Sequence, residues 1–304
     1  MRSTDFRVLS KASGAAVLGV LLAMTLALPA AAAEEMTGTD GPGAQILPYL
    51  EEHNMNETNC AIGWYDLETG DSWYFGADTY IKAGSMYKLP LVMAVTDKIA
   101  AGELDPEGFT RGYQIGQAMG WAIVYSDNDA AQALRYTLAP DKAAYRNYLA
   151  AYSGIPLEDL PEEYYSDNRM SPRFMIGTLL YLYEHSDQYG EIIENMKASH
   201  PGRYFQSTQG EYEIAHKYGY FEGALNDCAI VYTPRPFLLV VFTKNVSYSE
   251  DRLGELCAMM TDYALTLETL PSPDPTPTPA PDPEDPASYC PALPAVAAGV
   301  AALK

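Results

Sequence analysis

The chain has 304 residues and carries 19 lysines and arginines against 40 aspartates and glutamates, a formal net charge of −21. This length provides for one large domain or two small ones. So acidic a chain argues against a partnership with nucleic acid or with an anionic lipid surface.

The first 33 residues have the three parts of a secretory signal peptide. Basic residues come first, then an apolar run, then small residues suited to cleavage: Arg2, Arg7 and Lys11, residues 15–28, and residues 31–33. We therefore expect residues 1–33 to be a signal peptide and residues 34–270 to be the folded domain. The expected location is secreted or extracytoplasmic, in association with the cell envelope.

Hydrophobic periodicity and turn residues predict the elements of the domain in chain order. An amphipathic helix (44–53) precedes a hairpin of two strands (60–65 and 72–75) and a buried helix (85–101). Two helices over 114–137 meet at 125–128, and further helices follow at 141–152, 172–185 and 191–198, with an acidic irregular stretch at 154–171. Strands at 212–220, 228–232 and 237–245 lead to a closing helix at 249–269.

Strands thus lie at both ends of the domain, with a mostly helical block between them. Hairpin connections make the predicted sheet antiparallel. The expected fold class is α+β: an antiparallel five-stranded sheet flanked by helices, together with an all-helical lobe.

The amino-acid composition of the last 34 residues does not favour a hydrophobic core. Residues 271–286 contain eight prolines and four acids, which is typical of a stiff, extended linker. Residues 292–303 are apolar but fall short of the roughly 20 residues that span a bilayer. We expect 271–304 to be a Pro-rich linker and a short tail, which is an interfacial or partner-binding segment, an anchor remnant or, most simply, a disordered end.

Cysteine and histidine usage gives no sign of a metal or another cofactor. Cys60, Cys228, Cys257 and Cys290 could form disulfides in an exported protein, although the first three lie in predicted strands or a helix and could equally be buried thiols. No Cys-x-x-Cys motif or His/Cys cluster is present, and the four histidines are scattered. We therefore expect no metal, no cofactor and no histidine-based triad.

Ser85 and Lys88 mark the first candidate site, at the start of the predicted helix 85–101. Three positions apart, they are neighbours on one helix face, and a lysine of lowered pKa can take the proton of a serine hydroxyl. The Ser85 N–H belongs to the first turn and can point at a developing oxyanion, while Gly84 permits close approach. Taken alone, the pattern favours the simpler interpretation, a helix start with a serine cap and a solvated lysine.

Two further motifs follow in order. Ser-Asp-Asn at 126–128 lies between helices, and Lys-Tyr-Gly at 217–219 lies on a strand. The simple structural alternatives are a helix N-cap for the former and a solvated strand lysine for the latter. Ser-Asp-Asn also recurs at 166–168, which we interpret as turn chemistry because only the first copy precedes an amphipathic helix.

Together the three motifs resemble the S-x-x-K, S-D-N and K-T-G set of class A β-lactamases and penicillin-binding proteins. The resemblance covers about residues 44–268. It implies that Ser85 is the acylated nucleophile, that Lys88 is its general base, and that Ser126 relays a proton to the leaving nitrogen.

The resemblance also implies the substrate contacts. Asn128 would hold the substrate amide and Lys88, and Lys217 would supply positive charge for a substrate carboxylate and help to lower the pKa of its neighbours. The oxyanion hole would be the N–H groups of Ser85 and Tyr220. The implied substrate-binding residues are Asn128, Tyr218, Gly219 and Tyr220.

Two departures from the family pattern concern substrate and turnover. Tyr218 stands where the family has a threonine or serine whose hydroxyl helps to bind the carboxylate. A Glu-x-x-Leu-Asn segment, whose glutamate activates the deacylating water in class A enzymes, is missing between Ser126 and Pro172. Glu162 and Glu163 are the candidate deacylation residues by distance. We hypothesise that neither is an efficient base, so that the acyl-enzyme persists.

The sequence therefore predicts an exported, monomeric active-site-serine hydrolase of the class A β-lactamase/penicillin-binding type. Its ligand would be a β-lactam or a D-alanyl cell-wall peptide, and the compressed spacing of the first two motifs would open the cleft to peptide-like substrates. Two alternatives stay open: a non-catalytic cell-envelope module that binds peptide or carbohydrate through its tyrosines, and a Ser-Lys esterase.

Overall fold

The computed structural model describes residues 33–139, 141–208 and 210–267. The predicted signal peptide up to residue 32, the Pro-rich tail and Cys290 lie outside the described residues. In the part that is described, no helix is long and apolar enough to cross a membrane.

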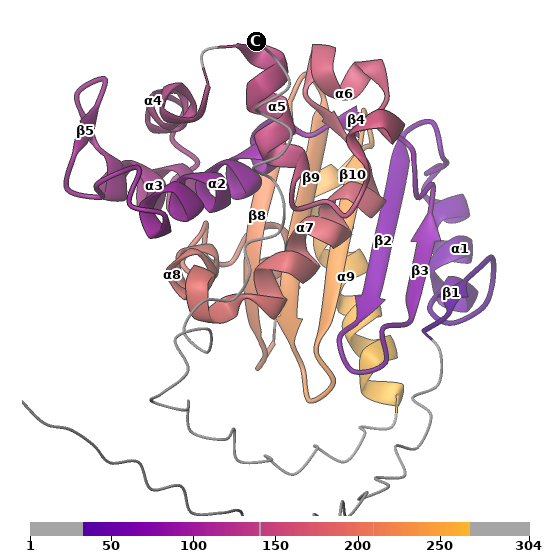
Figure 1. The fold of residues 1–304 in the computed structure, drawn as a ribbon. Coiled ribbons are helices and arrows are strands. Elements are labelled where there is room, and N and C mark those ends of the chain that lie inside the picture. Colours follow the sequence, from indigo (N-terminus) through magenta and orange to yellow (C-terminus); the bar gives the residue numbers. More distant parts are fainter. Residues whose placement is uncertain (1–32, 140, 209, 268–304) are drawn as a thin grey trace, which may run out of the picture. The chain divides into compact units, whose positions relative to one another are not determined.

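A mixed sheet forms the centre of the fold, with the strand order β1-β3-β2-β10-β9-β8 (Figure 1). Its main strands are β2 (Cys60–Asp66), β3 (Ser72–Phe75), β8 (Glu213–Phe221), β9 (Ala224–Tyr232) and β10 (Phe237–Thr243). These five strands pair antiparallel, as predicted. β1 (Glu35–Met36) adds a sixth strand parallel to β3, and its two residues are too few for alternation to reveal it from sequence.

The central strand β10 is buried on both faces because helices cover the sheet from both sides. Leu238 and Val240 belong to the core beneath α7 (Pro172–Glu184). Leu239 and Val241 belong to the opposite core, which is covered by α1 and α9 (Figure 1). These two helices are Gly43–Glu52 and Ser249–Thr266. The period of two in a strand thus divides one apolar run between two cores.

The helical lobe lies beyond the β8 edge of the sheet (Figure 1). Its members are α2 (Lys88–Ala100), α3 (Ile115–Val124), α4 (Asn128–Leu138), α5 (Lys142–Ala150) and α8 (Ser186–Lys197). α4 and α5 begin at side-chain caps, since Asp127 accepts from the Ala130 N–H and Asp141 accepts from the Ala144 N–H. The predicted helix boundaries therefore hold to within a few residues.

The chain departs from the predicted elements at two places. The helix expected from residue 85 begins as a 3₁₀ turn, η1 (Gly84–Tyr87), before α2. The stretch expected to be irregular contains α6 (Glu162–Asp167) and β7 (Arg169–Met170), and β7 pairs with β4 (Ile81–Lys82).

Small elements complete the described chain. Two short 3₁₀ helices, η2 (Leu157–Asp159) and η3 (Tyr204–Thr208), and the hairpin of β5 (Phe109–Thr110) with β6 (Tyr113–Gln114) lie in the connections. Cys60, Cys228 and Cys257 are buried free thiols. Of the two possibilities, disulfides or buried thiols, the structure therefore has buried thiols at these three residues.

Candidate active site

Ser85 lies in η1, which packs directly against the edge strand β8. A Cβ atom on Gly84, whose φ is +55°, would lie 2.6 Å from the Tyr220 nitrogen. A Cβ atom on Gly219 would lie 2.0 Å from the Ala83 oxygen. Both positions require glycine because the two backbones touch there. This close approach places the Ser85 main chain beside the end of β8.

The hairpin register shows where the Tyr220 N–H points. β8 and β9 join through a two-residue turn whose closing pair is Phe221 and Ala224. Such a closing pair is hydrogen-bonded, so the alternation of antiparallel strands makes Tyr220 and Leu225 a non-hydrogen-bonded pair. The Tyr220 N–H therefore points outward from the free edge of β8, towards η1. The Ser85 N–H donates to no acceptor among the described residues, so both groups are available to an oxyanion.

Lys88 is fully buried at the start of α2. Its Nζ donates to the Ser126 main-chain oxygen at 2.5 Å and to Asn128 Oδ1 at 2.8 Å, and it lies 3.4 Å from Ser126 Oγ. Burial lowers the pKa of Lys88 to about 8, against the opposing effect of the Asp127 carboxylate. A neutral amine has two N–H groups for the two close acceptors and keeps a lone pair for a proton, which suits a general base.

Lys217 lies on β8 and is also fully buried. Its Nζ donates to Ser126 Oγ at 3.0 Å and to the Tyr218 main-chain oxygen at 3.0 Å. Burial and, next, the charge of Lys88 lower the pKa of Lys217 to about 7, while Asp227 opposes the shift. The charge of Lys88 thus disfavours the charged form of Lys217, which increases the neutral fraction of Lys217.

The tripeptide at 126–128 combines two uses. Asp127 caps α4, while Ser126 and Asn128 on either side of it face the two lysines. Ser126 has a φ of +53°, the left-handed conformation that turns its hydroxyl and carbonyl to the lysines before the helix begins. The cap interpretation therefore holds for Asp127, while Ser126 and Asn128 lie where the site interpretation expects them to contact the lysines.

Tyr218 does not take the place of a small hydroxyl. Its half-buried ring stacks on Tyr204, with ring centroids 4.5 Å apart and 13° between the planes, and meets His200 edge-on at 4.6 Å. The Lys217 Nζ lies 4.4 Å from the centroid of the same ring. Tyr218 thus belongs to an aromatic cluster, and Tyr220, 64% exposed, is the open tyrosine of this strand.

The candidate deacylation residues make no hydrogen bond or ion pair with the lysines or with Ser85 among the described residues. Glu162 and Glu163 are exposed at the start of α6, and within the described residues neither carboxylate makes a hydrogen bond or an ion pair. From the same segment, Asn168 Nδ2 donates to the Gly84 oxygen at 3.0 Å. The stretch 166–168, expected to be a turn, is instead the end of α6, with Asn168 as the helix C-cap. Sequence reasoning missed this contact, because nothing local shows that the Asn168 side chain meets a residue 84 positions away.

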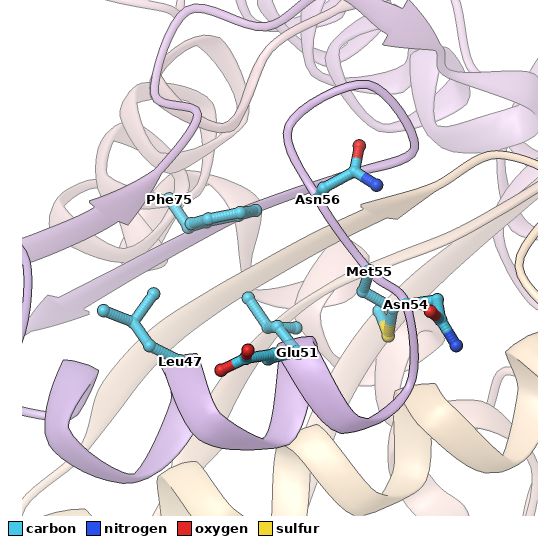
Figure 2. Close-up of a pocket in the computed structure, with 7 residues that line it drawn as sticks. Leu47, Glu51, Asn54, Met55, Asn56 and Phe75 are labelled. Carbon is cyan, nitrogen blue, oxygen red and sulfur yellow. The ribbon is translucent and has the colours of Figure 1, made fainter.

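The pocket in Figure 2 is separate from these residues. It has a volume of about 410 Å³ and is lined by Leu47, Leu50, Glu51, Asn54, Met55, Asn56 and Phe75. Its lining holds one carboxylate and no nucleophile beside a base, so it does not compete with Ser85 as a catalytic centre. The described residues also contain no cluster of three or more histidine, cysteine, aspartate or glutamate side chains that could hold a metal ion.

Comparisons with known proteins give the family and the fold. The model of the family described as "Beta-lactamase enzyme family" matches residues 46–264. The structure of PBP-A is 17% identical and covers 78% of this chain and 100% of its own, with a TM-score of 0.64. An acyl-enzyme complex of a PBP-A mutant with penicillin G is 18% identical, covering 77% of this chain and 99% of its own, with a TM-score of 0.63.

A third solved structure is a β-lactamase from Xanthomonas campestris pv. campestris. It is 15% identical, covers 73% of this chain and 98% of its own, and has a TM-score of 0.63. At these identities the likeness shows the fold. No curated protein matches the chain.

Proposed function

The chain belongs to the β-lactamase enzyme family and is a serine hydrolase of that superfamily, and on this premise we propose that Ser85 is acylated by a β-lactam or a D-alanyl peptide. The observation that carries the proposal is the placement of Lys88, buried, of lowered pKa, and one turn from Ser85. A neutral buried amine beside a serine is the arrangement that generates an alkoxide at neutral pH.

In the proposed acylation, Lys88 accepts the Ser85 hydroxyl proton as Oγ bonds to the substrate carbonyl carbon. The carbonyl oxygen becomes an oxyanion, which the N–H groups of Ser85 and Tyr220 stabilise. When the carbonyl re-forms, the C–N bond breaks and a proton passes from Lys88 through the Ser126 hydroxyl to the leaving nitrogen. The products are an ester on Ser85 and a free amine, or the opened ring when the substrate is a β-lactam.

Deacylation is proposed to be slow. Hydrolysis of the ester needs a base for the attacking water, and Glu162 and Glu163 are exposed and make no hydrogen bond or ion pair among the described residues. The penicillin G acyl-enzyme of the PBP-A mutant supports a long-lived adduct in this fold. A penicillin-binding or D,D-peptidase activity fits this arrangement better than rapid β-lactam turnover.

An extracytoplasmic location accompanies the proposed function. The basic, apolar and small-residue segments of positions 1–33 support export, and cell-wall peptides are found outside the cytoplasm. The proposed enzyme acts on a small-molecule β-lactam or a cell-wall peptide, and a monomer suffices for this, since all the proposed catalytic residues come from one chain.

A Ser-Lys esterase is the second candidate, and one observation favours it. The stacking of Tyr218 removes the small hydroxyl that would bind a substrate carboxylate, and an uncharged ester does not need that contact.

The deciding experiment is intact-mass measurement at intervals after penicillin is added to the chain lacking residues 1–33. We expect a penicillin-sized adduct that maps to Ser85, persists beyond minutes, and is absent from Ser85→Ala. Ser166→Ala, an exposed serine on α6, is the matched control and should keep the adduct. An adduct that survives in Ser85→Ala would refute the site. Ester hydrolysis without any adduct would instead support the esterase.

A further inference from the structure

Asn168 connects α6 to the strand that pairs with the chain just before Ser85. It lies in the left-handed region, with φ +48° and ψ +44°, and its main-chain oxygen accepts the Ala83 N–H at 2.9 Å. Its side-chain Nδ2 donates to the Gly84 oxygen at 3.0 Å. One residue therefore holds two of the three peptide groups that immediately precede the nucleophile, those of Lys82–Ala83 and Gly84–Ser85, although it belongs to none of the three motifs.

Arg146 fixes the orientation of the Asn168 amide. The guanidinium is buried, with 2% of the residue exposed, and Nη1 donates to Asn168 Oδ1 at 3.0 Å. A guanidinium can only donate and the Gly84 oxygen can only accept, so Oδ1 must face Arg146 and Nδ2 must face Gly84. The guanidinium lies 3.9 Å from the Tyr164 ring centroid, and no carboxylate of the described residues pairs with it. Among these residues the Arg146 guanidinium therefore has no acidic partner, and it binds the neutral side-chain amide of Asn168.

The Gly84 oxygen and the Ser85 N–H belong to the same planar peptide group. A hydrogen bond accepted by the oxygen polarises that group, which strengthens its N–H as a donor and fixes its direction. We propose that Asn168 is a positioning residue of the oxyanion hole, acting on the Ser85 N–H through the Gly84 carbonyl. This inference rests on the proposed function, because it requires that Ser85 be acylated.

Asn168→Asp tests the inference with almost no change in volume. The aspartate keeps an acceptor for Arg146 but sets a carboxylate oxygen, not an N–H donor, against the Gly84 oxygen. We expect the carbonyl stretching band of the penicillin acyl-enzyme to move to higher wavenumber in isotope-edited infrared difference spectra, since weaker hydrogen bonds polarise the ester less. Acylation should slow roughly tenfold, less than the 100-fold or more that follows loss of a whole oxyanion donor.

Ser166→Ala is the matched control from the same segment. Ser166 is exposed, and only its main-chain oxygen is used, by Lys142 Nζ. We expect the wild-type band and acylation rate. Arg146→Met is the second test variant, because it releases the Asn168 amide and removes a buried charge that lacks an acid partner, a change that folded proteins often tolerate. Its band should move in the same direction as that of Asn168→Asp.

The outcomes separate this inference from the proposed function. A wild-type protein that forms no adduct overturns the acyl-enzyme function itself. If an adduct forms but its carbonyl band keeps the wild-type position in both variants, the role of Asn168 alone is overturned, even if thermal unfolding shows a loss of stability. If Asn168→Asp does not fold, the band of Arg146→Met decides.

Discussion

Lys88 and Lys217 both place their ammonium nitrogens within hydrogen-bond distance of one hydroxyl, Ser126 Oγ, at 3.4 and 3.0 Å. One lysine comes from the first residue of a helix and the other from an edge strand. Because burial lowers the pKa of both, to about 8 and about 7, the site near neutral pH holds less than two positive charges. Their charge state therefore links catalysis, substrate choice and stability.

The pH dependence of acylation should differ between charged and uncharged substrates. A lysine is neutral above its pKa, so the base form of Lys88 grows as pH rises through about 8. The charge of Lys217 is lost as pH rises through about 7. With an uncharged ester, the rate of acylation should rise to a plateau. With a penicillin carboxylate it should pass through a maximum between these values. Stopped-flow acylation across pH 5–10 would show this, and identical profiles for both substrates would contradict it.

Lys217→Met should slow acylation by penicillin, whose carboxylate loses its cation, but stabilise the fold. Replacement of a buried charge by an apolar side chain of similar length commonly changes stability by between 0 and about 4 kcal/mol in the favourable direction. The sign follows from the lowered pKa: below the ordinary 10.5 the unfolded chain binds the proton more readily, so the wild type loses stability as pH falls from 10.5 towards 7. Urea unfolding at pH 7 and pH 9 measures this.

The free energy of unfolding of Lys217→Met should depend less on pH than that of the wild type. The difference in unfolding free energy in favour of the variant should be larger at pH 7 than at pH 9. Lys244→Met is the control, because Lys244 is exposed and its replacement should leave both values near the wild type. A Lys217→Met protein less stable than the wild type at pH 7 would refute the prediction.

Tyr218→Thr should shift selectivity towards substrates that carry a carboxylate. The change supplies the small hydroxyl that the stacked ring does not, so the ratio of acylation rates for penicillin over a simple ester should rise several-fold. Loss of the ring contacts with Tyr204 and His200 should cost about 1–3 kcal/mol of unfolding free energy. The ester rate serves as the internal reference, and an unchanged ratio would show that Tyr218 does not govern carboxylate recognition.

Glu162→Gln and Glu163→Gln should leave the lifetime of the acyl-enzyme unchanged. Both carboxylates are exposed on α6, and no hydrogen bond connects either to the site in the part of the chain that is described. Intact-mass decay of the adduct checks this. If either variant abolished steady-state turnover while acylation survived, the hypothesis that these glutamates are not deacylation bases would be wrong.

The sequence predicts the main elements well because each has a local signature. The alternating and apolar strands, the side-chain caps at Asp127 and Asp141, and the proline at the start of α7 all act within a few residues. The five antiparallel strands and the helical lobe follow from these. β1 was missed because its two residues are too few to show hydrophobic alternation. The 3₁₀ turn η1 was missed because its conformation depends on contact with β8, which is distant in sequence.

The site was predictable as a set of residues but not as an environment. The three motifs single out Ser85, Lys88, Ser126 and Lys217, yet the burial that lowers the pKa of both lysines arises from elements distant in sequence. The stacking of Tyr218 on Tyr204 depends on a loop whose position has no local signature. The turn interpretation of 166–168 is wrong, because Ser166 and Asp167 end helix α6 and Asn168 is its left-handed C-cap. The side-chain contacts of Asn168 are tertiary, so no local signature reveals them.

The division of β10 between two cores has a practical consequence for altering this protein. Leu239 and Val241 pack with α1 and α9, while the neighbouring Leu238 and Val240 pack on the side of α2, which carries Lys88. The sheet therefore separates Lys88 from changes in the other half, and the site meets the α1/α9 core where Tyr218 stacks on Tyr204. Directed evolution can repack the α1/α9 side for heat resistance and use the gain to tolerate disruptive substitutions around Ser85.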